Sequence, residues 1–421
     1  MIVYFTKDPV DQGLNNYHAP ENKPLNWYPP VEEVRPRVYH KYVNKNSPIY
    51  TDLYPDLVEV GVKSISDISK AINESVDDVI EVKLAADIEV PVRDDGKITT
   101  IFVPKGKTLK VDLNGHEYKC VAYAFYVYGS LVITDSSSSK KGVIRTTNHN
   151  TYAAIMAIGE EASVYMDAGT INTLTPEDTE TANWMYGVVC MNGATATITG
   201  STNIITDEAS CLSTNNTTGQ GHFYVAGDAK LSAKKCSAIY QASMDIIDIK
   251  DNAVVNGGII ARMGHITVSG KAKVINNGFE GGYDDFGAYL PTGNGPAALQ
   301  YALFHAAGTY KGNGEAGSND LVFTVKDNAV VKSNDSVAVM VADLGTGFDQ
   351  VSKINLKDDK VDWQVLSYDE AKEIVTASGK TLGAKKATTD ITVTVGGAVV
   401  YPVGTEGTVT PPSEITEEDD F

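Results

Sequence analysis

The sequence predicts a mainly β protein of the β-solenoid type, in which short strands coil into stacked rungs. Three observations support this fold class: short segments that alternate apolar and polar residues, corners rich in Gly, Asn and Asp, and one hexapeptide that occurs twice. The hexapeptide KDNAVV stands at 250–255 and at 326–331, and its flanks match as well. We therefore expect both copies to form the same corner of the same type of rung.

The spacing of equivalent alanines predicts the length of a rung. Ala253 aligns with Ala272, 19 residues later, and Ala329 follows after a further 57 residues, which equals three more steps of 19. A period of about 19–20 residues accommodates three strands and three short corners. Stacked rungs would share one core. Ala253 and Ala329 would face that core, and the Lys-Asp-Asn turns would face solvent.

Residues 1–60 differ in composition from the rest of the chain. They contain eight of the 16 prolines and seven of the 22 tyrosines. Proline removes backbone donors and excludes a long helix, whereas so many aromatic rings argue against a disordered segment. We interpret 1–60 as an extended arm that either packs on its own domain or docks on a partner. The candidate anchors are Trp27, Tyr28, Tyr39 and Tyr42.

Residues 64–75 predict a short amphipathic helix. Ile65, Ile68 and Ile72 fall on one face, and Ser64 is a suitable N-cap. Because the helix precedes the first strand, we expect it to close the N-terminal end of a solenoid that extends over 61–345.

The stretch 276–319 interrupts the predicted period. We interpret it as an insertion of Gly-rich loops around a short helix, PAALQYALFHAAG. Loops on a rigid scaffold often carry binding, and the insertion is rich in aromatic residues. Two interpretations stay open: Tyr301 and Phe304 pack on the solenoid, or the aromatic group contacts a glycan or another subunit. The residues of that group are Tyr283, Phe286, Tyr289, Tyr301 and Phe304.

Beyond residue 345 the sequence predicts a small α+β region, 346–421. The segment SYDEAKEIVTASG indicates a helix with Ser367 as its cap, and DITVTVGGAVVYPVG indicates a hairpin that turns at Gly396–Gly397. The tail PSEITEEDDF carries five acidic residues in its last eight and predicts a disordered end.

Composition excludes several classes of function. The net charge of −19 argues against sequence-independent binding of nucleic acid and against adsorption to anionic membranes. No apolar run is long enough to span a bilayer. The four cysteines form no CxxC pair, and the seven histidines show no metal-ligand spacing. We therefore expect neither a metal nor another cofactor.

Three strand segments resemble the opening rungs of right-handed parallel β-helix proteins of the pectate-lyase-like type. These segments are VKLAADIEV, GKTLKVDLNG and GSLVITDSSSSKKGVI, and the resemblance covers about 80–275 and again 319–341. It implies a right-handed parallel β-helix. It does not imply one activity, because polysaccharide lyases, hydrolases, adhesins and phage fibres share this fold.

Enzymes of this fold place carboxylates on the outer face of adjacent rungs as acid, base or Ca²⁺ ligands. The nearest candidates here are Asp284 and Asp285 in GGYDDFG. Neighbouring residues of a strand point to opposite faces, so a solvated turn is the alternative interpretation. A catalytic cation would have to be Arg145 or Arg262, but the sequence favours a surface residue, or one of a ladder of side chains on successive rungs, for either of them.

The arm and the short C-terminal region are similar in style to head-fibre and decoration proteins of crAss-like tailed phages. The resemblance implies a virion structural protein, assembled in the host cytoplasm and anchored to capsid or other virion proteins through 1–60. It also implies a homotrimer and contact with host-surface glycan, without need for catalysis. Two alternatives remain: a polysaccharide lyase or glycoside hydrolase acting on acidic or capsular glycan, and a bacterial surface adhesin. The latter is disfavoured because MIVYFTKDPVDQG lacks the pattern of a signal peptide.

Overall fold

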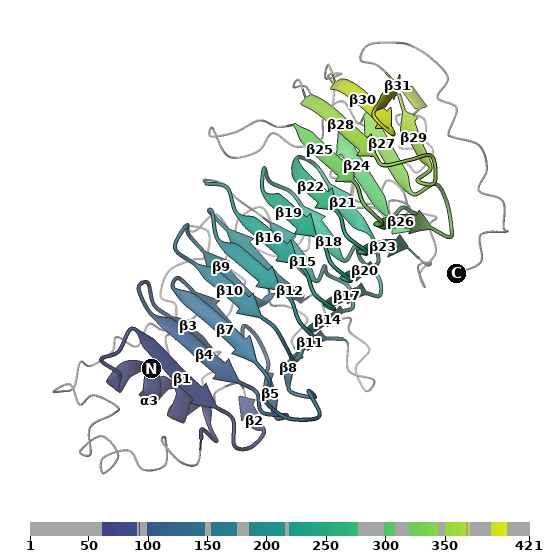
Figure 1. The fold of residues 1–421 in the computed structure, drawn as a ribbon. Helices are drawn as coiled ribbons and strands as arrows, with labels where there is room; N and C mark the ends of the chain where they lie inside the picture. The colour runs from purple at the N-terminus through teal and green to yellow at the C-terminus, as the bar shows by residue number, and fades with distance from the viewer. Residues whose placement is uncertain are drawn as a thin grey trace. The chain divides into compact units, whose positions relative to one another are not determined.

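Two compact units, Met1–Ala209 (unit 1) and Ser210–Phe421 (unit 2), make up the chain. In each unit three parallel sheets form a solenoid-like stack, and the chain visits the three sheets in rotation (Figure 1). The mainly β, solenoid-like class is thus confirmed. The computed structural model describes residues 61–90, 92, 99–147, 153–174, 185–214, 219–276, 299–307, 320–343, 350–367, 369–370 and 389–401.

The strands of unit 1 are short, and parallel pairing joins each to its equivalent on the next rung. The first sheet contains β1 (Val79–Lys83), β4 (Thr108–Asp112), β7 (Ser130–Thr134), β10 (Ser163–Met166) and β13 (Thr195–Ile198). The second contains β2 (Ile88–Val90), β5 (Glu117–Cys120), β8 (Val143–Thr146), β11 (Thr170–Thr173) and β14 (Asn203–Thr206). The third contains β3 (Ile101–Val103), β6 (Phe125–Val127), β9 (Ala153–Ile158) and β12 (Tyr186–Met191).

Like residues stack on like along the core of unit 1. In the first sheet Ile80 pairs with Leu109, Leu109 with Leu131, Leu131 with Val164, and Val164 with Ala196. All five side chains are buried. Side chains of a strand alternate between the two faces of the sheet. Pairing one buried residue with its equivalent on the next rung therefore places the apolar residues of each strand on the inner face.

Helix α3 (Ile65–Glu74) lies at the start of unit 1, as predicted. Ser64 Oγ accepts a hydrogen bond from the Asp67 N–H at 3.2 Å, and the Asp67 carboxylate accepts one from the Ser64 N–H at 2.9 Å, which completes a capping box. Ile68 and Ile72 are buried. The helix contacts β1 and β3, the first strands of two sheets, and so covers this edge of the stack.

Unit 2 repeats the arrangement. Its first sheet contains β16 (His222–Val225), β19 (Ile246–Ile249), β22 (Gly264–Val268), β25 (Leu321–Val325), β28 (Gln350–Leu356), β30 (Thr389–Val395) and β31 (Ala398–Tyr401). The second contains β17 (Lys230–Ala233), β20 (Val254–Asn256), β23 (Lys273–Asn276) and β26 (Val330–Ser333). The third contains β15 (Leu212–Thr214), β18 (Ile239–Gln241), β21 (Ile259–Ala261), β24 (Leu303–Ala307), β27 (Val339–Asp343) and β29 (Trp363–Leu366).

The two KDNAVV copies occupy equivalent corners, between β19 and β20 and between β25 and β26. In both copies the aspartate adopts the left-handed conformation, with φ of 60° at Asp251 and 58° at Asp327. Ala253 and Ala329 are fully buried, and each donates its N–H back to the lysine carbonyl three residues earlier. The three residues before each alanine are exposed. The interpretation of the repeat as one type of corner is confirmed.

The predicted regular period is wrong. Ile246 pairs with His265, 19 residues later, but His265 pairs with Val322, 57 residues later. The two hexapeptides are therefore two rungs apart and not four, because one rung holds a long excursion. The entropic cost of closing a loop grows only slowly with its length. The number of residues in a rung can therefore vary while the strands keep the same pairing register.

The predicted helix at 296–308 is also wrong, because part of it forms β24. This strand pairs in parallel with β21 on one side and β27 on the other. All five of its residues are buried. A strand buried on both faces has a continuous apolar sequence, which cannot be distinguished from a buried helix by periodicity alone. The range 276–319 therefore includes a regular strand of the stack and is not wholly an insertion.

The stack extends beyond residue 345, where the sequence predicted a separate region. β28 pairs with β25, β30 with β28, and β29 with β27, all in parallel. The hairpin turn at Gly396–Gly397 is confirmed: β31 is antiparallel to β30, and both glycines have positive φ. Ser367 Oγ accepts a hydrogen bond from the Glu370 N–H at 3.3 Å, as expected of a cap. The remainder of the predicted helix and the acidic tail lie outside the described residues.

Candidate functional site

Most of the residues predicted to carry function lie outside the described residues. This applies to the arm with Trp27, Tyr28, Tyr39 and Tyr42, and to the carboxylates Asp284 and Asp285. It also applies to Tyr283, Phe286 and Tyr289. Their roles stay predictions.

Tyr301 and Phe304 are both buried, and their rings stack with centroids 5.8 Å apart. Phe304 belongs to β24, and burial raises the pKa of the Tyr301 hydroxyl. The structure therefore places this pair in the packed interior of unit 2, as the first of the two interpretations expected. Neither ring offers a free face to a glycan.

The two arginines weighed as catalytic cations have packing and pairing roles. Arg145 forms an ion pair with Glu117 on the preceding rung. Arg262 is buried, with its guanidinium 5.2 Å from the ring centroid of Tyr240. Arg145 therefore pairs with a side chain of the neighbouring rung, as expected of a ladder residue. Arg262 is buried, so it is not a surface residue.

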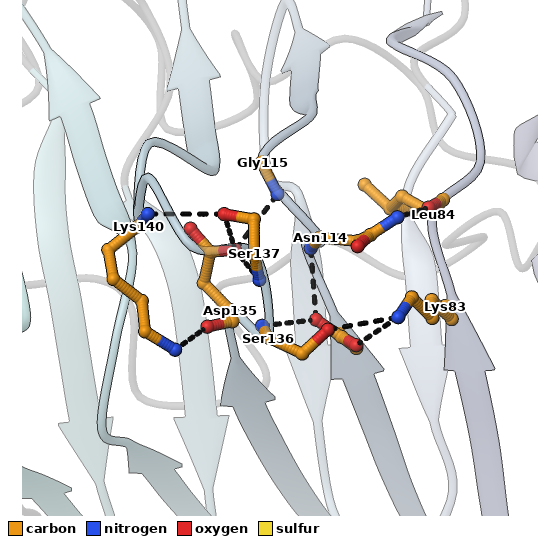
Figure 2. A network of polar contacts seen from close by, with 9 residues as sticks. Lys83, Leu84, Asn114, Gly115, Asp135, Ser136, Ser137 and Lys140 are labelled. Atoms are coloured by element: carbon orange, nitrogen blue, oxygen red, sulfur yellow. Dashed lines mark hydrogen bonds and ion pairs between the residues drawn. The ribbon is translucent and has the colours of Figure 1, made fainter.

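A polar network joins three successive rungs of unit 1 around the buried carboxylate of Asp135 (Figure 2). One carboxylate oxygen accepts from the Gly115 N–H at 2.9 Å and from the Ser137 hydroxyl at 2.7 Å, and the other accepts from the Gly142 N–H at 2.7 Å. Lys140 donates to the Asp135 carbonyl. Burial raises the pKa of Asp135, but the bonds from Ser137, Gly142 and Gly115 outweigh it and hold the pKa below its usual value.

Asp112 extends this network toward the first rung. Its carboxylate accepts from the N–H groups of Asn114 at 2.9 Å and Ser136 at 2.8 Å, and it lies 3.5 Å from Lys83 Nζ. The Asn114 amide donates to the Leu84 carbonyl at 2.9 Å. Burial raises the pKa of Asp112. The hydrogen bonds from Ser136 and Asn114 and the charge of Lys83 have a larger effect in the opposite direction, so the pKa lies below its usual value. Each carboxylate is thus engaged by neighbouring rungs, so the network stabilises the corner.

A second polar cluster projects from the first sheet of unit 2. His222 Nε2 lies 2.7 Å from Asp248 Oδ2, and the His222 ring stacks on Tyr224 with centroids 3.8 Å apart. Lys250 Nζ lies 5.8 Å from the Tyr224 ring centroid. β16 supplies His222 and Tyr224, β19 supplies Asp248, and Lys250 directly follows β19. Tyr224 is paired directly with Asp248. Sequence reasoning missed this cluster, although aligning HFYV with IIDI by their alternation would have brought the residues together.

The chemistry available to the described residues is limited. They contain no group of three or more His, Cys, Asp or Glu side chains placed to hold a metal ion. All four cysteines are free thiols, and three of them are buried. In the described part of the chain, no helix combines the length and the apolar character that crossing a membrane requires.

Comparisons with known proteins add no assignment. No model of a protein family matches the chain, and neither a curated protein nor a solved structure matches it significantly.

Proposed function

We propose that this chain is a structural protein of a phage virion, a head-fibre, decoration or tail-associated component. In this proposal a right-handed parallel β-helix forms a rigid shaft, and residues 1–60 anchor it to capsid or other virion proteins. The shaft assembles as a homotrimer and meets host-surface glycan. The protein reaches the virion by assembly in the host cytoplasm.

One observation supports a structural role: charged side chains on the outer faces of unit 1 bridge successive rungs. Lys110 Nζ lies 2.9 Å from Glu81 on the rung before, and Lys119 Nζ lies 2.9 Å from Glu89. Arg145 and Glu117 form a third such pair. A single exposed ion pair contributes little to stability. Several such pairs between successive rungs together favour one register of the neighbouring strands. Such a surface suits a shaft better than a catalytic groove.

Deletion of residues 1–55 tests the anchor. We expect phage particles that assemble in the presence of the truncated protein not to incorporate it, as judged by mass spectrometry of purified particles. The purified truncated protein should keep its β-sheet circular dichroism. A double variant, Trp27→Ala with Tyr28→Ala, should reduce incorporation, whereas Tyr165→Ala, at an exposed residue of β10, serves as the control. Unchanged incorporation of the deleted protein would contradict the proposal.

Incubation with capsular polysaccharide tests the enzymatic alternative. We expect the purified protein to leave the polymer's chain length unchanged in size-exclusion chromatography. Depolymerisation that is abolished by Asp284→Ala or Asp285→Ala would replace the structural role with catalysis.

A further inference from the structure

Four aromatic rings form a continuous row on the first two rungs of unit 1. The ring centroid of Tyr128 lies 5.4 Å from those of both Phe102 and Tyr126, and the rings of Tyr126 and Tyr123 are 5.9 Å apart. Phe102 belongs to β3 and Tyr126 to β6, and the two residues are direct partners in the pairing of these strands. We name Phe102, Tyr123, Tyr126 and Tyr128 the aromatic row.

The aromatic row lies on the outer face of the third sheet. Phe125, the residue before Tyr126, points into the core, where its ring stacks on that of Tyr118 from the second sheet, with centroids 5.7 Å apart. Because neighbouring residues of a strand point to opposite faces, Tyr126 and its partner Phe102 point outward. The row is therefore separate from the core that the three sheets share.

This outer face differs from those of the other two sheets of unit 1. The first sheet carries Lys110 at an outward position, and the second carries Lys119 and Arg145, each paired with a carboxylate. On the third sheet, by contrast, Tyr126 is only 3% exposed, and its partner on the next rung, Met156, is fully buried. Among the described elements, no helix and no second sheet forms a layer over β6. A cluster of rings on an outer face is typical of a surface that binds another segment or another protein.

Residues 1–60 join unit 1 at the end of the stack that carries the row. Val62, which follows the arm closely, forms a parallel bridge with Leu84 on the first rung. Helix α3 comes next and contacts β3, the strand of Phe102. About 20 residues of extended chain span roughly 60 Å, so the aromatic part of the arm can reach the row.

The arm has the composition that an aromatic surface binds. Residues 24–36, PLNWYPPVEEVRP, combine four prolines with the adjacent rings of Trp27 and Tyr28. Proline-rich segments favour an extended helix that loses little entropy on binding, and they dock on surfaces lined with aromatic rings. The other connections of unit 1 that lie outside the described residues are shorter and mostly polar: 93–98, 148–152 and 175–184.

We propose that the aromatic row is the docking surface for residues 24–36 of the same chain. Trp27 and the pair Pro29–Pro30 stack on the rings of the row, and the segment lies across β3 and β6. Rings and prolines have few rotatable bonds, so their contact costs little conformational entropy. The inference goes beyond the virion role, because it concerns a contact within one chain.

Limited digestion of the purified full chain with trypsin tests the docking. Arg35 precedes a proline and resists trypsin, so Arg37 is the first cleavage site after the docked segment. Mass spectrometry follows cleavage after Arg37 over time. A docked arm is protected at this site, whereas a free arm is cut as fast as a synthetic peptide of residues 20–45.

The variants remove one ring each. Tyr128→Ala deletes the ring that contacts two others of the row, and Tyr123→Ala is the alternative if that variant does not fold. The matched control is Tyr165→Ala, the same change at an exposed ring of the first sheet. Trp27→Ala changes the arm alone. Circular dichroism shows whether each variant is folded.

We expect Tyr128→Ala and Trp27→Ala each to speed cleavage after Arg37 about tenfold, whereas Tyr165→Ala leaves the rate unchanged. Because the two rings belong to one contact, the variant with both Tyr128→Ala and Trp27→Ala should be cut no faster than either single variant.

Several results would overturn the proposal. Cleavage of the wild type at the rate of the free peptide would show that the arm is not docked. An unchanged rate in the row variants, or fold-changes that multiply in the double variant, would place Trp27 on another surface. A rate that falls with rising protein concentration would assign the row to the arm of a second copy. Each measurement uses the purified chain, so the virion role is tested separately.

Discussion

His305 and Ser352 are hydrogen-bonded inside unit 2, with 2.8 Å between Nε2 of the imidazole and Oγ of the serine. Nδ1 lies 3.0 Å from the carbonyl oxygen of Ala261, which can only accept. The ring therefore carries its proton on Nδ1, and Nε2 accepts from the Ser352 hydroxyl. Both side chains are fully buried, and burial lowers the pKa of His305 to about 4.

This histidine predicts a loss of stability in mild acid. The unfolded chain takes up a proton near pH 6.5, whereas the folded protein resists protonation until about pH 4. The stability that His305 contributes is thus present above pH 6.5 and is lost as the pH falls toward 4. We expect the free energy of unfolding to decrease by about 3 kcal/mol over that range, measured by denaturant titration at several pH values.

The variant His305→Gln isolates this effect, because glutamine does not titrate. Its absolute stability will be lower, but the pH dependence between 6.5 and 4 should largely disappear. The carboxylates Asp112 and Asp135 do not interfere, since their pKa values are held below 3.8 and their contribution is lost only at lower pH. If the stability of His305→Gln depended on pH as the wild type does, His305 would not be the source of the acid sensitivity.

Asp135 should be the most sensitive polar residue of unit 1. Asp135→Ala leaves the N–H groups of Gly115 and Gly142 without their acceptor, so we expect a loss of roughly 3 kcal/mol in the free energy of unfolding. Ser137→Ala removes a single hydroxyl donor from the same carboxylate and should cost about 1 kcal/mol. Similar losses for both variants would show that the carboxylate is not the centre of the network.

Gly264 and Gly159 provide a matched test of close packing between rungs. Their φ angles are nearly the same, 94° and 98°. An added Cβ at Gly264 would lie 2.5 Å from the carbonyl oxygen of Asp245 and 2.1 Å from Gln241 Nε2, whereas nothing lies within 4 Å of the same atom at Gly159. Gly159→Ala should therefore cost only backbone strain, about 1–3 kcal/mol.

The Gly264→Ala variant should lose a further 1–3 kcal/mol or so, because it must also displace backbone atoms of the adjacent corner. Thermal unfolding followed by circular dichroism measures both. If the two alanine variants melt at the same temperature, the corner that contains Gln241 and Asp245 can move to accept the added methyl group, and the prediction is wrong.

Features that depend on neighbouring residues were predictable from the sequence. Ser64 and Asp67 are three residues apart and form the capping box of α3. The pair Gly396–Gly397 turns the hairpin, because both residues adopt positive φ without steric cost. The two KDNAVV segments form like corners because each contains its own turn and its own inward alanine.

Features that depend on distant strands became visible only in the folded protein. The number of rungs between the hexapeptides, the strand Leu303–Ala307 and the rungs beyond residue 345 all follow from pairing with partners tens of residues away. The contacts of His222 with Asp248 and of His305 with Ser352 arise in the same manner. The alternation of the strands and the composition of the corners could be read from short stretches of sequence. Strand pairing chose which segments become neighbours, because a loop of almost any length can close at little additional cost.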